Sequence, residues 1–333
     1  MPNTVSSLPI SAPLAALGAL GVDIDRIIGV AELPRAQLAD PSARLPVELM
    51  TRLWDAAVHV SGDPAIGLRV GEQIHLGALG SFEYLLRHSA TLREVLARAD
   101  RFMRLVDDTC AIELDEGAET AVLRLSRRGG YFHPQPEVEC FFGACRSLQK
   151  KEWPELHILA VHFAGPCPTA PAAYQRYFGC TVRFDRGRNE LCFPSSLLET
   201  MTRDADPNLG RVLEAHAQHL LSQLPEGDPL VQAARANLLE QLVDGPPSLA
   251  ALARALHMSE RTLRRRLTAE GTSYQALLED LRQQLAYHYV GRTRASFESI
   301  AERLGFADAT AFFRAFKRWS GKTPLQYRAS VPT

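Results

Sequence analysis

The sequence predicts an α+β domain followed by an all-α domain, in which two helix-turn-helix units are joined by a long helix. Three observations support this prediction. Apolar residues alternate in short segments between 111 and 193, helical apolar spacing occurs in two similar blocks after residue 248, and Pro and Gly cluster between the two regions. At 333 residues the chain also exceeds what one hydrophobic core usually fills. We therefore expect a first domain at 1–224, a linker at 225–229 and a second domain at 230–333.

The first domain combines helices with a later set of strands. A helix-rich stretch begins at Pro13, and apolar spacing predicts helices over 46–60, 63–74 and 91–106. Two alternating segments then form a hairpin around the turn Asp115-Glu116-Gly117. The strands of the hairpin, the helix that follows and the remaining strands are predicted at 111–114, 121–125, 136–149, 158–163, 181–184 and 190–193.

The second domain contains one pattern twice: a capped helix, a short turn and a second capped helix. The N-cap residues are Ser248 and Ser259 in the first unit, about 248–270, and Ser296 and Asp308 in the second, about 296–320. Other helices are predicted over 230–243 and 274–289, and Gly305 and Gly321 end the helices of the second unit. The units begin about 48 residues apart, from Ser248 to Ser296. Such internal duplication is much harder to obtain by chance than one amphipathic pair.

The second helix of each unit has an apolar face and an opposite polar or basic face. Leu263 and Leu267 lie four residues apart on one side of the first of these helices. Phe312, Phe316 and Trp319 share one side of the other. The opposite faces are expected to carry Arg261, Arg264 and Arg265 in the first unit and Thr310, Phe313, Arg314 and Lys317 in the second.

Charge is distributed unevenly between the two domains. From Pro229 onward there are 15 Lys and Arg against 9 Asp and Glu, a net charge of +6. The chain totals of 37 and 38 leave 22 basic and 29 acidic residues in 1–228, a net charge of -7. A basic domain favours a polyanionic partner, although a surplus of this size also occurs on ordinary solvated surfaces.

Composition and cysteine spacing exclude several other classes. Since 46% of residues are hydrophobic and 23% are charged, an ordinary folded protein is expected. No apolar run approaches the roughly 18 residues of a membrane span, and the start of the chain lacks a signal peptide, so we expect a cytoplasmic protein with no membrane partner. The six cysteines lack C-x-x-C spacing and are expected to be reduced, with no cofactor or metal.

One cluster could in principle form a metal site. It contains His133, Glu137, Glu139 and Cys140, with His157 and His162 further along the chain. Glu137 and Glu139 are only two residues apart and cannot share a helical face, and a His on an apolar strand is more often a hydrogen-bonded core residue. We therefore expect no metal here.

Three segments of the second domain resemble the DNA-binding domain of the AraC/XylS family of bacterial regulators. They are Ile300-Ala301-x-x-x-Gly305-Phe306, Phe312-x-Arg314-x-Phe316-Lys317-Arg318-Trp319-x-Gly321 and Thr323-Pro324-x-x-Tyr327-Arg328. The first unit is also similar to this family, through Ser248-Leu249-x-x-Leu252-Ala253-x-x-Leu256 and Met258-Ser259-x-Arg261-Thr262-Leu263-x-Arg265-x-Leu267. The resemblance covers about residues 229–329.

This resemblance implies that the long helix holds two recognition helices in successive major grooves of double-stranded DNA, ~34 Å apart. Arginine suits guanine because its planar fork makes two parallel hydrogen bonds. The implied DNA-binding residues are Ser259, Arg261, Arg264, Arg265, Ser296, Thr310, Phe313, Arg314 and Lys317. Family members commonly have a small polar residue in place of Phe313 and a polar cap in place of Ala307. The second helix-turn-helix unit is therefore expected to contact thymine methyl groups or to discriminate little between base sequences. Packing of Phe313 against the core remains an alternative.

The first domain resembles the arabinose-binding type of N-terminal domain found in one branch of the same family. The phrases are Gly62-Asp63-Pro64-Ala65-Ile66-Gly67-Leu68, Thr91-Leu92-Arg93-Glu94-Val95 and Tyr177-Phe178-Gly179-Cys180-x-Val182-x-Phe184. The resemblance implies a domain that binds a small-molecule effector of unknown identity or mediates self-association, and it makes a homodimer the expected assembly. RNA polymerase is a further candidate partner.

The leading hypothesis is a sequence-specific transcriptional regulator controlled by an effector. One alternative is a constitutive, architectural DNA-binding regulator whose first domain only dimerises. Another is an enzyme fused to the DNA-binding domain, which would need an activated Cys. Cys167 lies between Pro166 and Pro168 without an adjacent base, so no enzyme activity is expected.

Overall fold

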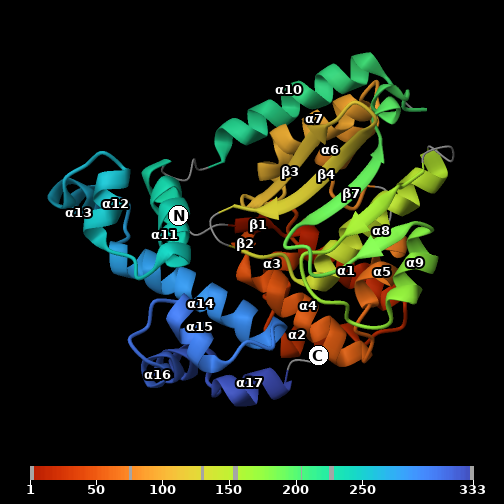
Figure 1. Cartoon of the computed structure of the whole chain (residues 1–333). Helices are drawn as coiled ribbons and strands as arrows, with labels where there is room; N and C mark the ends of the chain where they lie inside the picture. Colours follow the sequence, from red (N-terminus) through yellow and green to blue (C-terminus); the bar gives the residue numbers. More distant parts are fainter. Residues whose placement is uncertain are drawn as a thin grey trace. The chain divides into compact units, whose positions relative to one another are not determined.

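The computed structural model describes residues 4–74, 77–128, 131–152, 157–203, 205–224 and 229–330 (Figure 1). The chain divides into two compact bodies. The N-terminal body comprises Pro2–Ser126 and His133–Leu224, and the C-terminal body comprises Arg127–Phe132 and Pro225–Thr333. Of the predicted linker at 225–229, residues 225–228 lie outside the described residues. Within the described ranges, no helix is both long and apolar enough to cross a lipid bilayer.

The first part of the N-terminal body is mostly helical, with one short ribbon of two antiparallel strands. Its elements are β1 (Thr4–Ser6), α1 (Leu8–Ala19), α2 (Ile24–Val30), α3 (Arg35–Leu38), β2 (Arg44–Pro46), α4 (Glu48–Ser61), α5 (Ile66–Gln73), α6 (Ser81–Arg87), α7 (Leu92–Phe102) and η1 (Met103–Leu105). The predicted helices over 46–60, 63–74 and 91–106 correspond to α4, α5 and α7 with η1. Thr91 begins α7 because its side chain accepts a hydrogen bond from the backbone N–H of Glu94.

A five-stranded mixed sheet follows, in the order β3-β4-β7-β5-β6. The strands are β3 (Cys110–Glu116), β4 (Thr120–Arg127), β5 (Ala160–His162), β6 (Thr181–Arg183) and β7 (Asn189–Pro194). β7 pairs antiparallel with both β4 and β5, whereas β5 and β6 are parallel. The alternation along β4 buries Ala121, Leu123 and Leu125 in the core. The remaining elements of this body are α8 (Gln135–Glu152), α9 (Pro171–Phe178), η2 (Ser195–Glu199) and α10 (Pro207–Gln223).

Glycine permits the close packing of α5 against α8. A Cβ atom on Gly67 would overlap the carbonyl oxygen of Pro136, and one on Gly71 would overlap that of Cys140. The two helices therefore approach with backbone against backbone, an arrangement that a larger side chain at either glycine would force apart.

From Pro229 to Ser330 the C-terminal body consists of helices joined by turns. Its helices are α11 (Pro229–Asp244), α12 (Leu249–Ala255), α13 (Glu260–Ala269), α14 (Tyr274–Arg292), α15 (Phe297–Arg303), α16 (Ala309–Ser320) and α17 (Pro324–Ser330). Side chains from all of them contribute to one hydrophobic core, in which Leu252, Leu281 and Phe312 are fully buried. The predicted fold class, an α+β domain followed by an all-α domain with two helix-turn-helix units on a long helix, is confirmed.

Candidate nucleic-acid interface

The first helix-turn-helix unit consists of α12 and α13. The side chain of Ser248 accepts a hydrogen bond from the N–H of Ala251 at 3.1 Å, and that of Ser259 accepts one from the N–H of Thr262 at 3.2 Å. Each Ser thus satisfies a backbone donor that the start of a helix leaves free. On α13, Leu263 and Leu267 are fully buried. Helical periodicity then turns the residues between them toward solvent.

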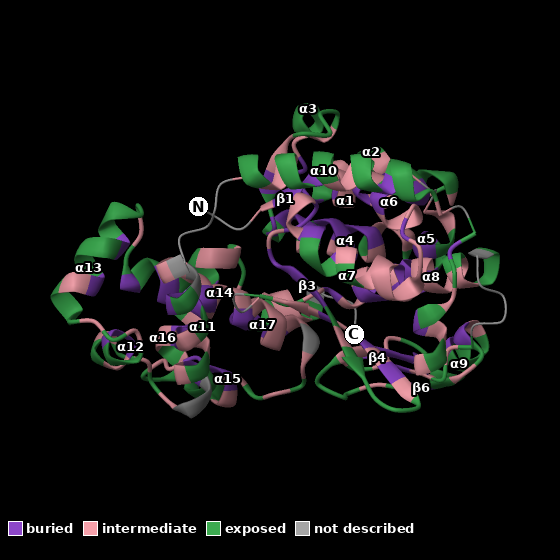
Figure 2. Ribbon diagram, turned by 90° about the horizontal axis from the view of Figure 1, so that it is seen from above, coloured by how far each residue is buried: buried purple, intermediate pink, exposed green. Residues whose placement is uncertain are grey.

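The exposed side of α13 carries a group of arginines, and much of this helix is green in Figure 2. Arg261, Arg264 and Arg265 are all exposed, as their spacing predicts. Arg264 pairs with Glu260 one turn earlier at 3.4 Å, and its side chain remains 68% exposed. Such an exposed pair contributes little free energy, so it leaves the guanidinium available to another anion.

The second unit consists of α15 and α16. Ser296 caps α15 through the N–H of Ser299 at 3.2 Å, and Asp308 caps α16 through the N–H of Ala311 at 2.7 Å. Between the two helices Gly305 has a φ of 66°, a left-handed conformation that glycine adopts without strain. The turn therefore has the residue that its backbone requires.

The outward face of α16 is less basic than that of α13. Thr310, Arg314 and Lys317 are exposed. Phe313 is half-buried, and its ring meets that of Phe297 edge to face at 5.3 Å between centroids. This contact favours the packing interpretation of Phe313 over direct contact with a base.

Both units are attached to α14 by hydrogen bonds from side chains to backbone carbonyls. Directly before the first unit, the carbonyl oxygen of Pro247 accepts a hydrogen bond from the Tyr274 hydroxyl at 2.8 Å. In the second, Arg282 donates through Nε to Leu304 at 2.7 Å and through Nη2 to Gly305 at 2.6 Å. Because α14 has 19 residues, it is roughly 28 Å long at 1.5 Å per residue. Both helix-turn-helix units are thus linked to the same helix.

Two further contacts fix α16 and the end of the chain. Glu279 on α14 pairs with Arg318 and accepts a hydrogen bond from Trp319 Nε1 at 3.1 Å. These bonds hold the pKa of Glu279 below its ordinary value. Arg328 donates to the carbonyl oxygens of Val290 at 3.0 Å and Ala295 at 2.9 Å. Arg282, Arg328 and Glu279 were not among the predicted site residues, because their partners lie 22 to 40 positions away and local spacing does not indicate them.

Two histidines of the candidate metal cluster, His133 and His162, are engaged in hydrogen bonds. His133 Nδ1 lies 2.9 Å from Glu137 Oε1, and its Nε2 lies 3.0 Å from the carbonyl oxygen of Ser126. His162 Nδ1 lies 3.1 Å from Glu190 Oε2. In the part of the chain that the structure describes, no group of three His, Cys, Asp or Glu side chains is placed to hold a metal ion.

The chemistry of Cys167 does not favour catalysis. Burial raises the pKa of its thiol, and the sulfur lies 3.2 Å from the carbonyl oxygen of Thr169. A raised pKa leaves little thiolate, which is the nucleophilic form.

Two helix-turn-helix units on a shared helix, each with a solvent-facing polar or basic second helix, define a DNA-binding protein. The arabinose-binding N-terminal domain model of AraC transcription regulators matches residues 21–201, and a helix-turn-helix domain model matches residues 252–330. The chain belongs to the AraC family of transcription regulators.

Several relatives are similar over most of their length. An ornithine utilization regulator of Pseudomonas aeruginosa is 31% identical, over 92% of this chain and 91% of its own. The regulator VirS of Mycobacterium tuberculosis is 30% identical, over 84% of this chain and 82% of its own. Among solved structures, the regulator CdpR of Pseudomonas aeruginosa has 25% identity and a TM-score of 0.42, and the match covers 92% of this chain and 96% of CdpR. The two family matches, the ornithine utilization regulator and VirS show that the chain is a DNA-binding transcriptional regulator.

Proposed function

We propose that each protomer binds double-stranded DNA with α13 and α16 in two adjacent major grooves, and that a small molecule bound in the N-terminal domain, 1–224, controls this binding. The observation that carries the first part is that Tyr274 bonds the segment just before the first helix-turn-helix unit, and Arg282 bonds the turn of the second, so that α14 contacts both units. A protein that holds two such helices at a fixed separation can recognise an asymmetric DNA site as a single protomer.

The two recognition helices differ in what they offer DNA. Arg261, Arg264 and Arg265 can each make paired hydrogen bonds with guanine O6 and N7. On α16, Thr310 and Arg314 are the residues proposed for base contact, Lys317 for phosphate contact and Phe313 for packing. We therefore assign most of the sequence specificity to α13.

Ser259 and Ser296 are assigned to phosphate rather than to bases. Both are exposed, and both hydroxyl oxygens already accept a backbone hydrogen bond as helix caps. The Ser259 hydroxyl also lies 2.9 Å from that of Thr262, which can serve as the donor of this pair. A hydroxyl that accepts one bond retains its own hydrogen for a phosphate oxygen. Their contribution is to position the protein on the duplex.

Substitution of the α13 arginines tests the DNA-binding proposal. Arg264→Ala and Arg265→Ala are each expected to weaken specific binding by about 1 to 3 kcal/mol for each lost paired contact. The measurement is a titration of the full chain with a duplex selected from random sequences. Arg211→Ala, an exposed substitution on α10, is the matched control. Unchanged affinity of both α13 variants for the selected duplex would remove this helix from the interface.

Effector control, pairing of two protomers and contact with RNA polymerase are further parts of the proposal. The family match over 21–201 supports a sensor role for the N-terminal domain. If no small molecule changes the affinity for the operator, the constitutive alternative, in which this domain only dimerises, replaces effector control.

A further inference from the structure

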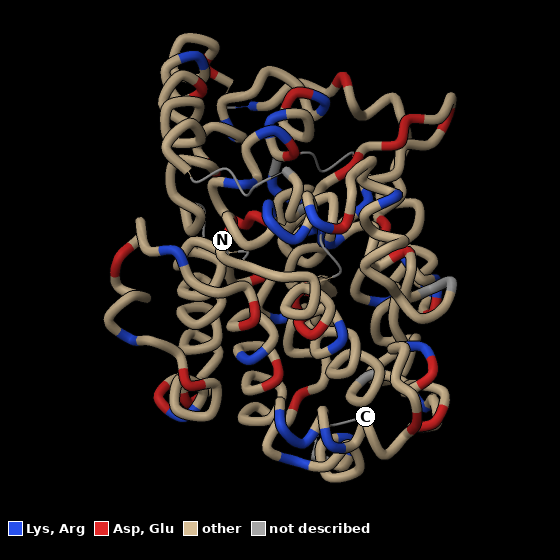
Figure 3. Tube along the Cα trace, turned by 90° about the vertical axis from the view of Figure 1, so that its left-hand side faces the viewer, with Lys and Arg blue, Asp and Glu red and all other residues tan. Residues whose placement is uncertain are grey.

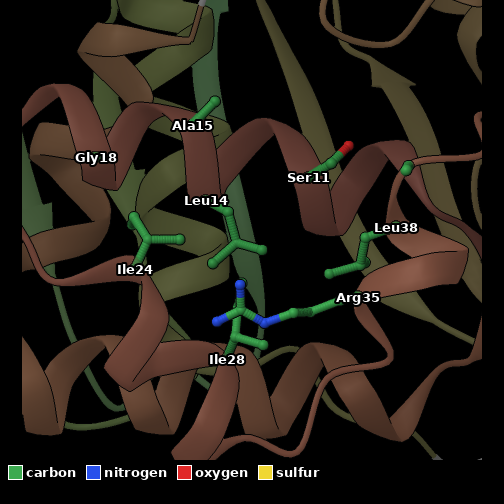
Figure 4. A pocket seen from close by; sticks show the side chains of 9 residues that line it. Ser11, Leu14, Ala15, Gly18, Ile24, Ile28, Arg35 and Leu38 are labelled. Carbon is green, nitrogen blue, oxygen red and sulfur yellow. The ribbon is translucent and has the colours of Figure 1, made fainter.

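The helices at the start of the N-terminal body line an open apolar groove. The groove has a volume of about 400 Å³ and lies among α1, α2 and α3 (Figure 4). Small-molecule sites in proteins typically range over roughly 300 to 1,000 Å³ and are lined mainly by apolar side chains. The residues that carry the argument are Leu14, Gly18, Ile24, Ile28, Leu38 and Arg35.

The walls of the groove are fixed by the local fold. Asp23 caps α2 by accepting a hydrogen bond from the N–H of Arg26 at 3.0 Å, and Ile27 on the same helix is fully buried. At Gly18 a Cβ atom would lie 3.3 Å from Ile24 Cγ1, so the absence of a side chain there brings α1 close to α2. The groove is therefore formed before any ligand arrives, which lowers the entropic cost of binding.

One charged side chain lines this otherwise uncharged surface. The guanidinium of Arg35 lies beside Leu14 and Ile28 (Figure 4). It pairs with Asp25 at 2.5 Å, and the two side chains are 61% and 81% exposed. An ion pair so exposed adds little stability, so a ligand carboxylate can take the place of Asp25 on Arg35.

We propose that this groove binds a small monocarboxylate with an apolar chain, the carboxylate on Arg35 and the chain along Leu14, Ile24, Ile28 and Leu38. A cation beside an apolar surface matches an anionic head joined to an apolar tail. Each further methylene buried in the groove strengthens binding by about fourfold. That the ligand acts as the effector rests on the proposed function, whereas binding itself rests on the groove alone.

The test uses octanoate as the probe and the full chain as the receptor. Octanoate is expected to raise the thermal midpoint through preferential binding to the folded state, while octanol has a weaker effect and octylamine none. Hexanoate and decanoate extend the series, and affinity should rise with chain length until the groove is filled. Equal stabilisation by octanoate, octanol and octylamine, or none by octanoate, overturns the proposal.

Two substitutions of the ion pair should move the affinity in opposite directions. Arg35→Gln should lose at least tenfold in affinity for octanoate, because the carboxylate loses a charge-assisted bidentate partner. Asp25→Asn should strengthen binding, because it removes the competing carboxylate. Arg26→Gln, an exposed neutralisation on α2 outside the groove lining, is the matched control and should leave affinity unchanged. If Arg35→Gln and Arg26→Gln behave alike, Arg35 is not the carboxylate partner and the proposal fails.

A second titration separates the groove from the proposed function. Affinity for operator DNA is measured with and without saturating octanoate. A change that Arg35→Gln abolishes supports the effector role. Octanoate binding without any change in DNA affinity overturns the effector role and leaves the groove as a binding site. Failure to bind any selected duplex overturns the proposed function, while the thermal measurements still decide the groove.

Discussion

Arg282 is the residue that joins the turn of the second helix-turn-helix unit to α14. Its half-buried guanidinium donates to the carbonyl oxygens of Leu304 and Gly305 and lies 4.8 Å from the centroid of the Phe306 ring. Carbonyl groups at the end of a short helix have no partner within the helix. Arg282 supplies these partners from another element and so fixes the turn in place.

We predict that Arg282→Met lowers the free energy of unfolding by about 1 to 3 kcal/mol, because carbonyl oxygens shielded from water lose their donor. Urea unfolding of the full chain followed by circular dichroism provides the measurement. Arg314→Met on the exposed face of α16 is the matched control, since it should weaken DNA binding and leave stability nearly unchanged. Equal loss of stability in both variants would contradict the structural role of Arg282.

The outward position of the α13 arginines could be predicted from the sequence, whereas the role of Arg282 could not. Arg261, Arg264 and Arg265 follow from helical spacing relative to Leu263 and Leu267, which is a local property of the chain. The partners of Arg282 are 22 and 23 positions away, so only the folded chain brings them together. Phe313 shows an intermediate case, because spacing placed it on the outward side while its contact with Phe297 turns part of the ring inward.

At the scale of elements, one carboxylate on α14 makes polar contacts with α16, beside the core packing of Tyr287 against Phe316. Glu279 accepts a hydrogen bond from Trp319 and pairs with Arg318, and these two partners hold its pKa below the ordinary value of 4.5. A carboxylate whose folded pKa is depressed stabilises the fold above its unfolded pKa. That stabilisation is lost as the pH falls through the folded pKa.

We therefore expect stability of the C-terminal body to decline below pH 4.5, and to decline less steeply in Glu279→Gln. The amide cannot titrate, and it keeps an oxygen that can accept the Trp319 hydrogen bond. Urea midpoints at neutral pH and at pH values below 4.5 would measure the difference. Glu298→Gln, an exposed substitution on α15, controls for the change of charge. Identical pH profiles for wild type and Glu279→Gln would contradict this assignment.

The helices that were predicted well begin with a recognisable cap. Ser248, Ser259, Ser296 and Asp308 each bond the backbone at the start of a helix, as expected from their residue types. The ribbon of β1 and β2 was missed because three residues per strand give too short a pattern for alternation to be recognised. The predicted helix over 91–106 is interrupted after Phe102, where the chain tightens into η1. The local sequence gives no signal for this change from α-helix to 3-10 helix.

At the scale of the whole molecule, both signs of charge are interspersed along the trace, although the chain from Pro229 onward has a net charge of +6 (Figure 3). A modest surplus of this kind acts on DNA mainly through contacts with phosphates, which release bound counterions. The remainder of the chain has a net charge of -7, which disfavours such contacts. DNA affinity should therefore depend strongly on salt.

We predict that the logarithm of the association constant falls linearly with the logarithm of salt concentration, with a slope of about -0.9 for each phosphate contacted. Lys317→Gln should reduce the magnitude of that slope by about 1 and weaken binding to all sequences similarly. Anisotropy titrations over a range of salt concentrations measure both effects. Lys150→Gln on the exposed side of α8 is the matched control. Salt-independent binding would argue against a phosphate-contacting role for the C-terminal body.

In the proposed mode of DNA binding, the shared helix α14 also restricts which operators can be used. Its 19 residues form one continuous helix that shares a core with both helix-turn-helix units. We therefore expect the two recognition helices not to rotate independently of each other. DNA turns once in about 10 to 10.5 base pairs, and inserting half a turn between the two subsites would carry one of them to the opposite side of the duplex. The genomic targets of this regulator should thus share one invariant distance between their halves, even where the bases in those halves differ.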